Sequence, residues 1–160
     1  MKWTAGEIDG VERRPLARHS DARGWLAEIF RSDEIRPDLA PAMGYVSVTH
    51  PGVARGPHEH KTQTDVFAFL GPGTFTVTMW DNRKASPTYG RRLTFTAGEN
   101  APTAVIVPPG VVHGYRNISP VDAWVVNFPN RLYAGKGRKS PVDEVRYEDG
   151  SNPDFRIEEK

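Results

Sequence analysis

Strict alternation of apolar and polar side chains is the feature that most constrains the fold of this chain. Residues 74–80 read Thr-Phe-Thr-Val-Thr-Met-Trp, so Phe75, Val77 and Met79 share one face of an extended segment. A period of two is typical of a β-strand. We predict that the apolar face lies in the core and that the threonines face solvent or line a cavity.

Similar short segments recur along most of the chain. Further strands are predicted at residues 11–18, 44–49, 66–70, 92–96, 104–107 and 123–128. The run at 66–70 ends at Gly-Pro-Gly and is expected to form a hairpin-like pair with 74–80. Residues 25–31 suit a strand by alternation and a helix by propensity, and one or two helical turns are expected from Ser32. Many short strands between Gly- and Pro-rich loops predict an all-β antiparallel barrel or sandwich with few short helices.

Length and charge narrow the class of protein. With 160 residues there is room for one buried core, so residues 1–160 are predicted to form a single domain. Residues 1–22 are expected to include an extended N-terminal arm, and the polar residues after 129 to pack loosely over the barrel. The net charge of +1 has acids and bases interspersed, without the basic stripe that nucleic-acid binding requires. The sequence has no cysteine, no signal-peptide pattern at its start and no run near the ~18 apolar residues of a membrane span, so we expect a cytoplasmic protein with no nucleic-acid or membrane partner.

Three of the five histidines fall in two segments beside predicted strands. Residues 55–65 read Arg-Gly-Pro-His-Glu-His-Lys-Thr-Gln-Thr-Asp, and residues 108–113 read Pro-Pro-Gly-Val-Val-His. Alternate side chains of a strand share a face, so two of the histidines can line one wall of a cavity that the third completes. Imidazoles and a carboxylate suit a divalent transition metal, and this spacing approximates the metal set of a cupin barrel. One hypothesis is therefore a metal-dependent cupin enzyme with the ligands His58, His60, Asp65 and His113.

A second pattern covers most of the chain. Four motifs occur in order: Asp21-x-Arg23-Gly24-x-Leu-x-Glu28, Arg55-Gly-x-His58, Asp81-x-Arg83-x-x-Ser86-Pro-Thr-x-Gly90 and Pro108-x-Gly110-x-x-His113-Gly114. Together they resemble the successive signatures of the dTDP-4-dehydrorhamnose 3,5-epimerase family. The resemblance implies a cupin-type jelly-roll barrel and a homodimer whose N-terminal segment extends the partner's sheet. It also implies a nucleotide-diphosphate sugar with a 4-keto-6-deoxy ring as substrate, and no metal.

The resemblance assigns roles to individual residues. His58 is expected to be the general base that takes a proton from the carbon next to the 4-keto group. An imidazole with a pKa near ~6.5 suits that task at neutral pH. Tyr133 is expected to return a proton from the opposite face, as the second catalytic residue. The residues expected to bind substrate are Arg23, Glu28, Arg55, His60 and His113.

The chain also departs from the family pattern. On our alignment Thr64 stands where the family has a lysine that stabilises the enolate oxygen, the C-terminal aspartate that orients the base is absent, and His60 is not the usual residue. We expect an epimerase acting at carbon 3, carbon 5 or both, without a cofactor, in deoxysugar or polysaccharide biosynthesis. The alternatives are the metal-dependent cupin enzyme with one divalent transition metal, and a sugar-nucleotide binder without activity. Asp81 and Arg83 are predicted to hold a loop by hydrogen bonds.

Overall fold

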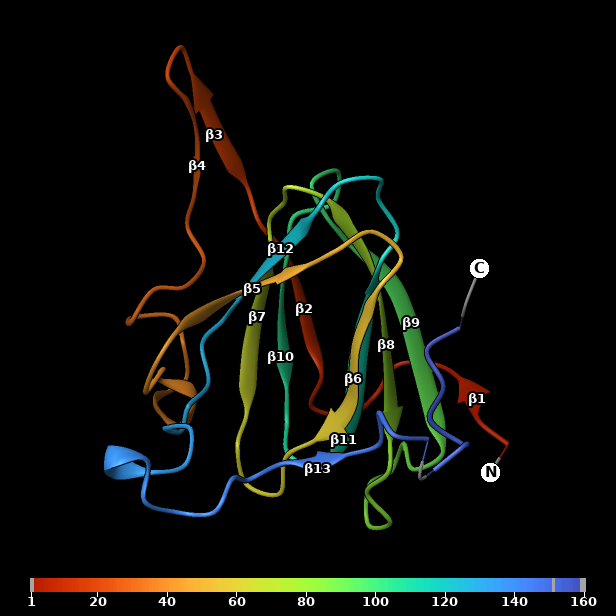
Figure 1. Ribbon diagram of the computed structural model, residues 1–160. Coiled ribbons are helices and arrows are strands. Elements are labelled where there is room, and N and C mark those ends of the chain that lie inside the picture. The colour runs from red at the N-terminus through yellow and green to blue at the C-terminus, as the bar shows by residue number, and fades with distance from the viewer. Residues whose placement is uncertain (1, 151, 159–160) are drawn as a thin grey trace.

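Two facing β-sheets form the body of the protein, which the computed structural model describes for residues 2–150 and 152–158 (Figure 1). One sheet has six strands in the order β1-β9-β8-β11-β6-β13, and the other has five in the order β2-β10-β7-β12-β5. All neighbouring strands are antiparallel except β1, which runs parallel to β9. This architecture confirms the predicted all-β, cupin-like jelly-roll barrel.

The elements are short, as the sequence predicts. The six-stranded sheet contains Thr4–Ala5 (β1), Arg91–Gly98 (β9), Thr74–Asp81 (β8), Val111–Asn117 (β11), Ala54–Glu59 (β6) and Val145–Arg146 (β13). The five-stranded sheet contains Glu12–Pro15 (β2), Thr103–Val107 (β10), Asp65–Phe69 (β7), Ala123–Asn127 (β12) and Tyr45–Thr49 (β5). A separate hairpin contains Arg18–Asp21 (β3) and Gly24–Ala27 (β4), and the 3₁₀ helices are Pro37–Leu39 and Lys136–Arg138. Within the described ranges, no helix is long and apolar enough to span a membrane.

The alternating face of β8 lies in the core. Phe75, Val77 and Met79 are 0%, 2% and 1% exposed, which confirms the prediction for this strand. They pack between the two sheets against residues of β7, β10 and β11, including Phe69 and Tyr115. Because this apolar filling occupies the middle of the barrel, polar side chains that point inward must collect towards one end.

The predicted hairpin between residues 66–70 and 74–80 is wrong. Strand β7 pairs with β10 and β12, whereas β8 pairs with β9 and β11 in the other sheet. The Gly-Pro-Gly turn therefore carries the chain across from one sheet to the other. Gly73 has a φ of 78°, a value that favours glycine. A Cβ atom on Gly73 would also come within 2.8 Å of the Cα of Ala123.

Only part of the N-terminal region projects from the barrel as the predicted arm. Strands β1 and β2 pair with β9 and β10 of the same chain, and Ile8 between them is 3% exposed in the core. The element that projects from the barrel is the β3–β4 hairpin (Figure 1). Residues 25–31 begin as strand β4 and end in a turn closed by the bond from Ile35 N–H to the carbonyl of Arg31, at 2.9 Å.

The C-terminal tail packs more tightly than the sequence suggests. Strand β13 pairs with β6, and Phe155 is 4% exposed in a cluster with Trp80 and Val112. A two-residue strand and a single buried aromatic ring leave no periodic pattern in a polar sequence. The prediction of a loosely packed tail is therefore wrong.

A buried carboxylate holds the loop that follows β8. Asp81 is 0% exposed and accepts hydrogen bonds from Arg83 Nε at 2.8 Å, Ser86 Oγ at 2.6 Å and Thr88 Oγ1 at 2.5 Å. Burial alone would raise the pKa of Asp81, but these hydrogen bonds outweigh it and hold the pKa at about 2. The predicted structural role of Asp81 and Arg83 is confirmed.

We expect Asp81→Asn to lower the free energy of unfolding by about 2 to 4 kcal/mol, because Arg83 loses its carboxylate partner. The folded pKa lies below the unfolded one, so the stabilisation by the native carboxylate is present above about pH 4 and is lost as the pH falls towards 2. Urea unfolding at neutral pH and near pH 3 measures both effects. The exposed Asp33→Asn serves as control and should leave the free energy of unfolding close to that of the native protein. Equal stability of Asp81→Asn and the native protein at neutral pH would contradict the role of this carboxylate.

Candidate active site

Four titratable side chains meet inside the barrel. Strand β6 provides His58, the residues that follow it provide His60, β7 provides Asp65 and β11 provides His113. One nitrogen or oxygen atom from each lies within 4.8 Å of the others. His58 and His113 are register partners on β6 and β11, whereas Asp65 comes from the opposite sheet. The structure therefore brings together the four residues that the sequence nominated as a metal set.

Asp65 is the centre of this cluster and is 1% exposed. Its Oδ1 atom accepts hydrogen bonds from Gln63 Nε2 and Asn127 Nδ2, both at 2.9 Å. Its Oδ2 atom has no hydrogen-bond partner and instead faces Nε2 of His60 at 3.2 Å and Nε2 of His113 at 3.5 Å. Burial raises the pKa of Asp65, but the two imidazoles outweigh it and hold the pKa below its usual range. The carboxylate is therefore ionised at neutral pH.

Backbone contacts fix the orientation of two imidazoles. His113 Nδ1 donates to the carbonyl of Val111 at 3.0 Å, and His60 Nδ1 donates to the carbonyl of Asp143. Because a carbonyl only accepts, Nδ1 carries the proton in both rings, and in the neutral form Nε2 presents a lone pair. Both Nε2 atoms point at Asp65 Oδ2, which is also an acceptor.

The position beside Asp65 Oδ2 favours a positive charge. Burial lowers the pKa of His60, but its contact with the Asp65 carboxylate outweighs burial and raises the pKa above its ordinary value. A proton on His60 Nε2 has a competitor, however, because the Gln63 amide donates to that same nitrogen at 3.1 Å. Three acceptor atoms thus face one another, and the Gln63 amide reaches His60 Nε2 but neither Asp65 Oδ2 nor His113 Nε2.

His58 lies at the edge of the cluster. Its ring packs edge-on against His113, with centroids 4.4 Å apart, and its Nδ1 atom lies 3.8 Å from Glu144 Oε1. The side chains of His58 and Glu144 are 16% and 13% exposed. Burial, followed by the charges of His113 and His60, lowers the pKa of His58 to about 2. His58 thus differs from an ordinary imidazole with a pKa near ~6.5, and its ring is neutral at physiological pH.

The segment before β13 provides two carboxylates that the motifs did not identify. Asp143 accepts hydrogen bonds from the backbone N–H groups of residues 61–63, at 3.1, 2.9 and 2.9 Å. Its neighbour Glu144 faces His58. Asp143 is 82 residues from Lys61 along the chain, so the contact leaves no local sequence signal.

A tyrosine and an asparagine extend the site towards β5. The Tyr45 hydroxyl accepts a hydrogen bond from Asn127 Nδ2 at 3.0 Å, and the same amide donates to Asp65. Burial raises the pKa of Tyr45, so the hydroxyl keeps its proton at neutral pH. Arg55 bonds to Thr49 Oγ1 at 3.0 Å and acts electrostatically on Tyr45. Tyr45 and Asn127 were not predicted as site residues, because their sequence signal was a single amide side chain in an apolar strand.

Two of the residues assigned to substrate lie on or beside the projecting hairpin. Arg23 is at its tip with the side chain 89% exposed, and it pairs with Asp21 at 2.5 Å. Glu28 follows β4 and pairs with Arg31 at 3.5 Å. The hairpin leads away from the barrel (Figure 1), so a single chain does not bring these residues to the histidine cluster.

The structure places the side chains of Tyr133 and Thr64 differently from what the motifs predict. Tyr133 is 53% exposed and acts electrostatically on Arg146, the strand neighbour of His58. Thr64 directly precedes Asp65, so its side chain points away from the interior that Asp65 enters. The interior position at the start of β7 is therefore held by a carboxylate and not by the neutral threonine.

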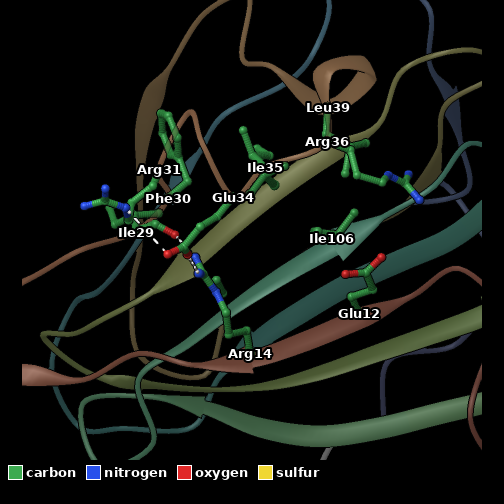
Figure 2. Close-up of a pocket in the computed structure, with 12 residues that line it drawn as sticks. Glu12, Arg14, Ile29, Phe30, Arg31, Glu34, Ile35, Arg36, Leu39 and Ile106 are labelled. Atoms are coloured by element: carbon green, nitrogen blue, oxygen red, sulfur yellow. Dashed lines mark hydrogen bonds and ion pairs between the residues drawn. The ribbon is translucent and has the colours of Figure 1, made fainter.

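A cavity of about 150 Å³ lies on the other side of the five-stranded sheet (Figure 2). Its apolar floor includes Val66 and Ile106, the outward-facing neighbours of interior positions on β7 and β10. Its rim is charged, and Glu34 pairs with Arg14 at 3.6 Å and with Arg31 at 3.5 Å. This cavity does not contact the histidine cluster.

Comparison with known proteins agrees with this architecture. Residues 5–141 match the model of the dTDP-4-dehydrorhamnose 3,5-epimerase family. A probable low-salt glycan biosynthesis epimerase of Haloferax volcanii is 38% identical over 127 residues, which are 79% of this chain and 81% of that protein. A spore coat polysaccharide biosynthesis protein of Bacillus subtilis is 35% identical over 128 residues, which are 79% of this chain and 82% of that protein.

Solved structures share the fold. The 3'-monoepimerase ChmJ of Streptomyces bikiniensis, in complex with dTDP-quinovose, is 26% identical with a TM-score of 0.75, and the match covers 89% of this chain and 71% of that one. The dTDP-4-dehydrorhamnose 3,5-epimerase of Sulfolobus tokodaii is 23% identical with a TM-score of 0.74, and the match covers 99% of this chain and 89% of that one.

Proposed function

Because the chain belongs to the dTDP-4-dehydrorhamnose 3,5-epimerase family and is an epimerase of nucleotide-linked sugars, we propose that His58 takes the proton that the reaction removes. The proposed substrate is a nucleotide-linked 4-keto-6-deoxy sugar, epimerised at carbon 3, carbon 5 or both. The proposed compartment is the cytoplasm, as the sequence predicts. The observation that carries the assignment is a neutral imidazole at the edge of the barrel cluster with a carboxylate 3.8 Å behind its Nδ1 atom.

Glu144 is proposed as the positioning residue for His58. A proton on Nδ1 directed at Glu144 leaves Nε2 as the basic atom, as in other sites where a carboxylate fixes the tautomer of a histidine. Catalytic hydrogen bonds are often long without substrate and shorten when it binds. Glu144 thereby takes the place of the orienting aspartate that the motif comparison found absent.

The low pKa of His58 sets a condition on the mechanism. A weak base removes a proton from carbon only when the neighbouring carbonyl is strongly polarised, so that the C–H electron pair can form the enolate C=C bond while the carbonyl π pair moves onto the 4-keto oxygen. The site must therefore supply positive charge or hydrogen bonds to that oxygen. Proton return to the opposite face of the carbon then completes the inversion.

We expect exchange of solvent deuterium into the sugar to depend on His58 and to be slowed by loss of Glu144. Native protein in D₂O should label carbon 3, carbon 5 or both of a dTDP-linked 4-keto-6-deoxy sugar, whereas His58→Ala should lose about 10²- to 10⁴-fold in rate, the usual contribution of a general base. Glu144→Gln should show an intermediate loss, mainly in kcat.

The control for this experiment is His50→Ala, which removes an exposed histidine paired with Asp122 and should exchange at the native rate. Exchange that survives in His58→Ala would contradict the assignment of the base. Saturable binding of the sugar nucleotide by native protein, without exchange at either carbon, would instead identify a binding protein without activity.

A tyrosine is proposed as the acid on the opposite face. Tyr133 is the candidate from the resemblance, and its electrostatic effect on Arg146, the register partner of His58, is consistent with a position on the same side of the barrel. Tyr45 is the second candidate, supported by its protonated hydroxyl beside Asn127. Each carries a phenolic O–H group, which can donate a hydrogen bond or a proton.

Removing the acid should allow proton abstraction while blocking inversion, because these two steps use different groups. The correct phenylalanine variant should therefore retain deuterium exchange and lose net epimerisation by about 10²-fold or more. Tyr45→Phe and Tyr133→Phe are a matched pair, since each deletes one hydroxyl. Full epimerisation by both variants would show that neither tyrosine is the acid.

A homodimer is proposed in which the β3–β4 hairpin of each copy contributes residues to the active site of its partner. This arrangement is supported by the exposure of Arg23 at the tip of the projecting hairpin. Guanidinium groups suit a diphosphate because they offer forked, permanently charged donors. Arg23 and Glu28 of one copy would then act with Arg55, His60 and His113 of the other.

We expect light scattering at tens of micromolar to give a dimer, and Arg23→Ala to raise KM more than it lowers kcat. Mixing inactive His58→Ala with Arg23→Ala should restore about a quarter of native activity at low substrate, because half of the dimers are hybrids with one intact site. Arg36→Ala, another exposed arginine, is the control. A monomer, or mixtures with no restored activity, would contradict the shared site.

A further inference from the structure

The three acceptor atoms around Asp65 form an arrangement that a cation would complete. Asp65 Oδ2 and His113 Nε2 are buried without a hydrogen-bond partner, and their residues are 1% and 2% exposed. His60 Nε2 points at the same oxygen. Lone pairs held together in a buried site repel one another unless a positive charge lies between them.

The spacing fits ligands of one metal ion. Two donors bound at about 2.1 Å lie about 3.0 Å apart at an octahedral right angle and about 3.4 Å apart at a tetrahedral angle. The distances from Asp65 Oδ2 are 3.2 Å to His60 Nε2 and 3.5 Å to His113 Nε2.

The outer contacts also match a metal site. Each ligating histidine in such sites donates its second ring N–H to a carbonyl or carboxylate, which fixes the tautomer. Here both Nδ1 atoms donate to backbone carbonyls, those of Val111 and Asp143. The second oxygen of Asp65 is held by Gln63 and Asn127, so the free oxygen is aimed at the two rings.

We propose that His60, Asp65 and His113 bind one divalent transition metal ion inside the barrel. Two imidazoles and one carboxylate suit zinc, manganese, iron, cobalt or nickel, and leave positions open for another ligand. When the ion binds, Gln63 gives up its contact with His60 Nε2. His58 stays outside the set, because its shortest carboxylate contact is with Glu144.

A bound ion would stabilise the negative charge that develops on the 4-keto oxygen, and this role rests on the proposed function. A divalent ion changes the charge of the carboxylate and two neutral imidazoles from minus one to plus one. When His58 takes the proton from carbon, the C–H pair becomes the C=C bond and the carbonyl π pair moves onto the 4-keto oxygen beside the ion. Such charge stabilisation is the usual contribution of a metal ion to enolisation.

The binding test uses the untagged full chain, treated with a chelator and then titrated with Zn²⁺ by calorimetry and with Co²⁺ by visible absorption. We expect one ion per chain. His60→Ala, Asp65→Asn and His113→Ala should weaken binding by more than the about 10- to 100-fold that loss of an outer contact costs. His50→Ala, which changes an exposed histidine outside the cluster, should bind as the native protein does. Near-UV circular dichroism confirms folding, and Asp65→Asn keeps the shape of the side chain.

Native protein that fails to bind either ion, or triad variants that bind as tightly as native protein, would overturn the metal site. Deuterium exchange then separates the site from the proposed function. Loss of exchange on chelation, with recovery on adding Zn²⁺ or Mn²⁺, supports the electrophilic role. Undiminished exchange in protein shown to be metal-free overturns that role and leaves the epimerase proposal standing. Binding of one ion without exchange under any condition supports the site and contradicts the epimerase proposal.

Discussion

The buried charge of Asp65 is the constraint on which the site depends. An ionised carboxylate at 1% exposure is costly unless every contact compensates it. Two amides satisfy one oxygen, and two imidazoles face the other. Those imidazoles are in turn oriented by carbonyls of β11 and of the tail before β13. The tail, both sheets and the loop at residues 60–63 are thus coupled through a single oxygen atom.

The same arrangement relates the proposed base, His58, to the charge at Asp65. Burial beside other imidazoles keeps His58 neutral and weakly basic, which alone would make a poor catalyst of proton abstraction. In the proposed mechanism, a cation beside Asp65 compensates by acidifying the carbon from which His58 takes the proton. The barrel therefore places the proposed base beside the proposed cation site, while the apolar cavity on the outer face of the five-stranded sheet stays separate.

The sequence predicted what depends on local pattern and missed what depends on contacts across the fold. Alternation identified β8 and most other strands, and motif spacing identified His58, His60, Asp65 and His113. Which strands pair was harder to predict, because a Gly-Pro-Gly turn can join two strands of one hairpin or two strands of facing sheets. Glu144 was missed because it reaches His58 through a two-residue strand. The shift of His58 to a low pKa arises only from burial that the fold creates.

The tautomers of His60 and His113 test this account most directly, since the cluster exists only if both Nε2 atoms are the ones turned towards Asp65. Long-range ¹H–¹⁵N correlation spectra of protein with ¹⁵N-labelled histidine report the proton on each ring nitrogen. The account predicts that Nδ1 carries a proton in both rings and that Nε2 is the nitrogen whose signal shifts when Zn²⁺ is added. Protonated Nε2 with bare Nδ1 in these two rings, unchanged by Zn²⁺, would contradict it.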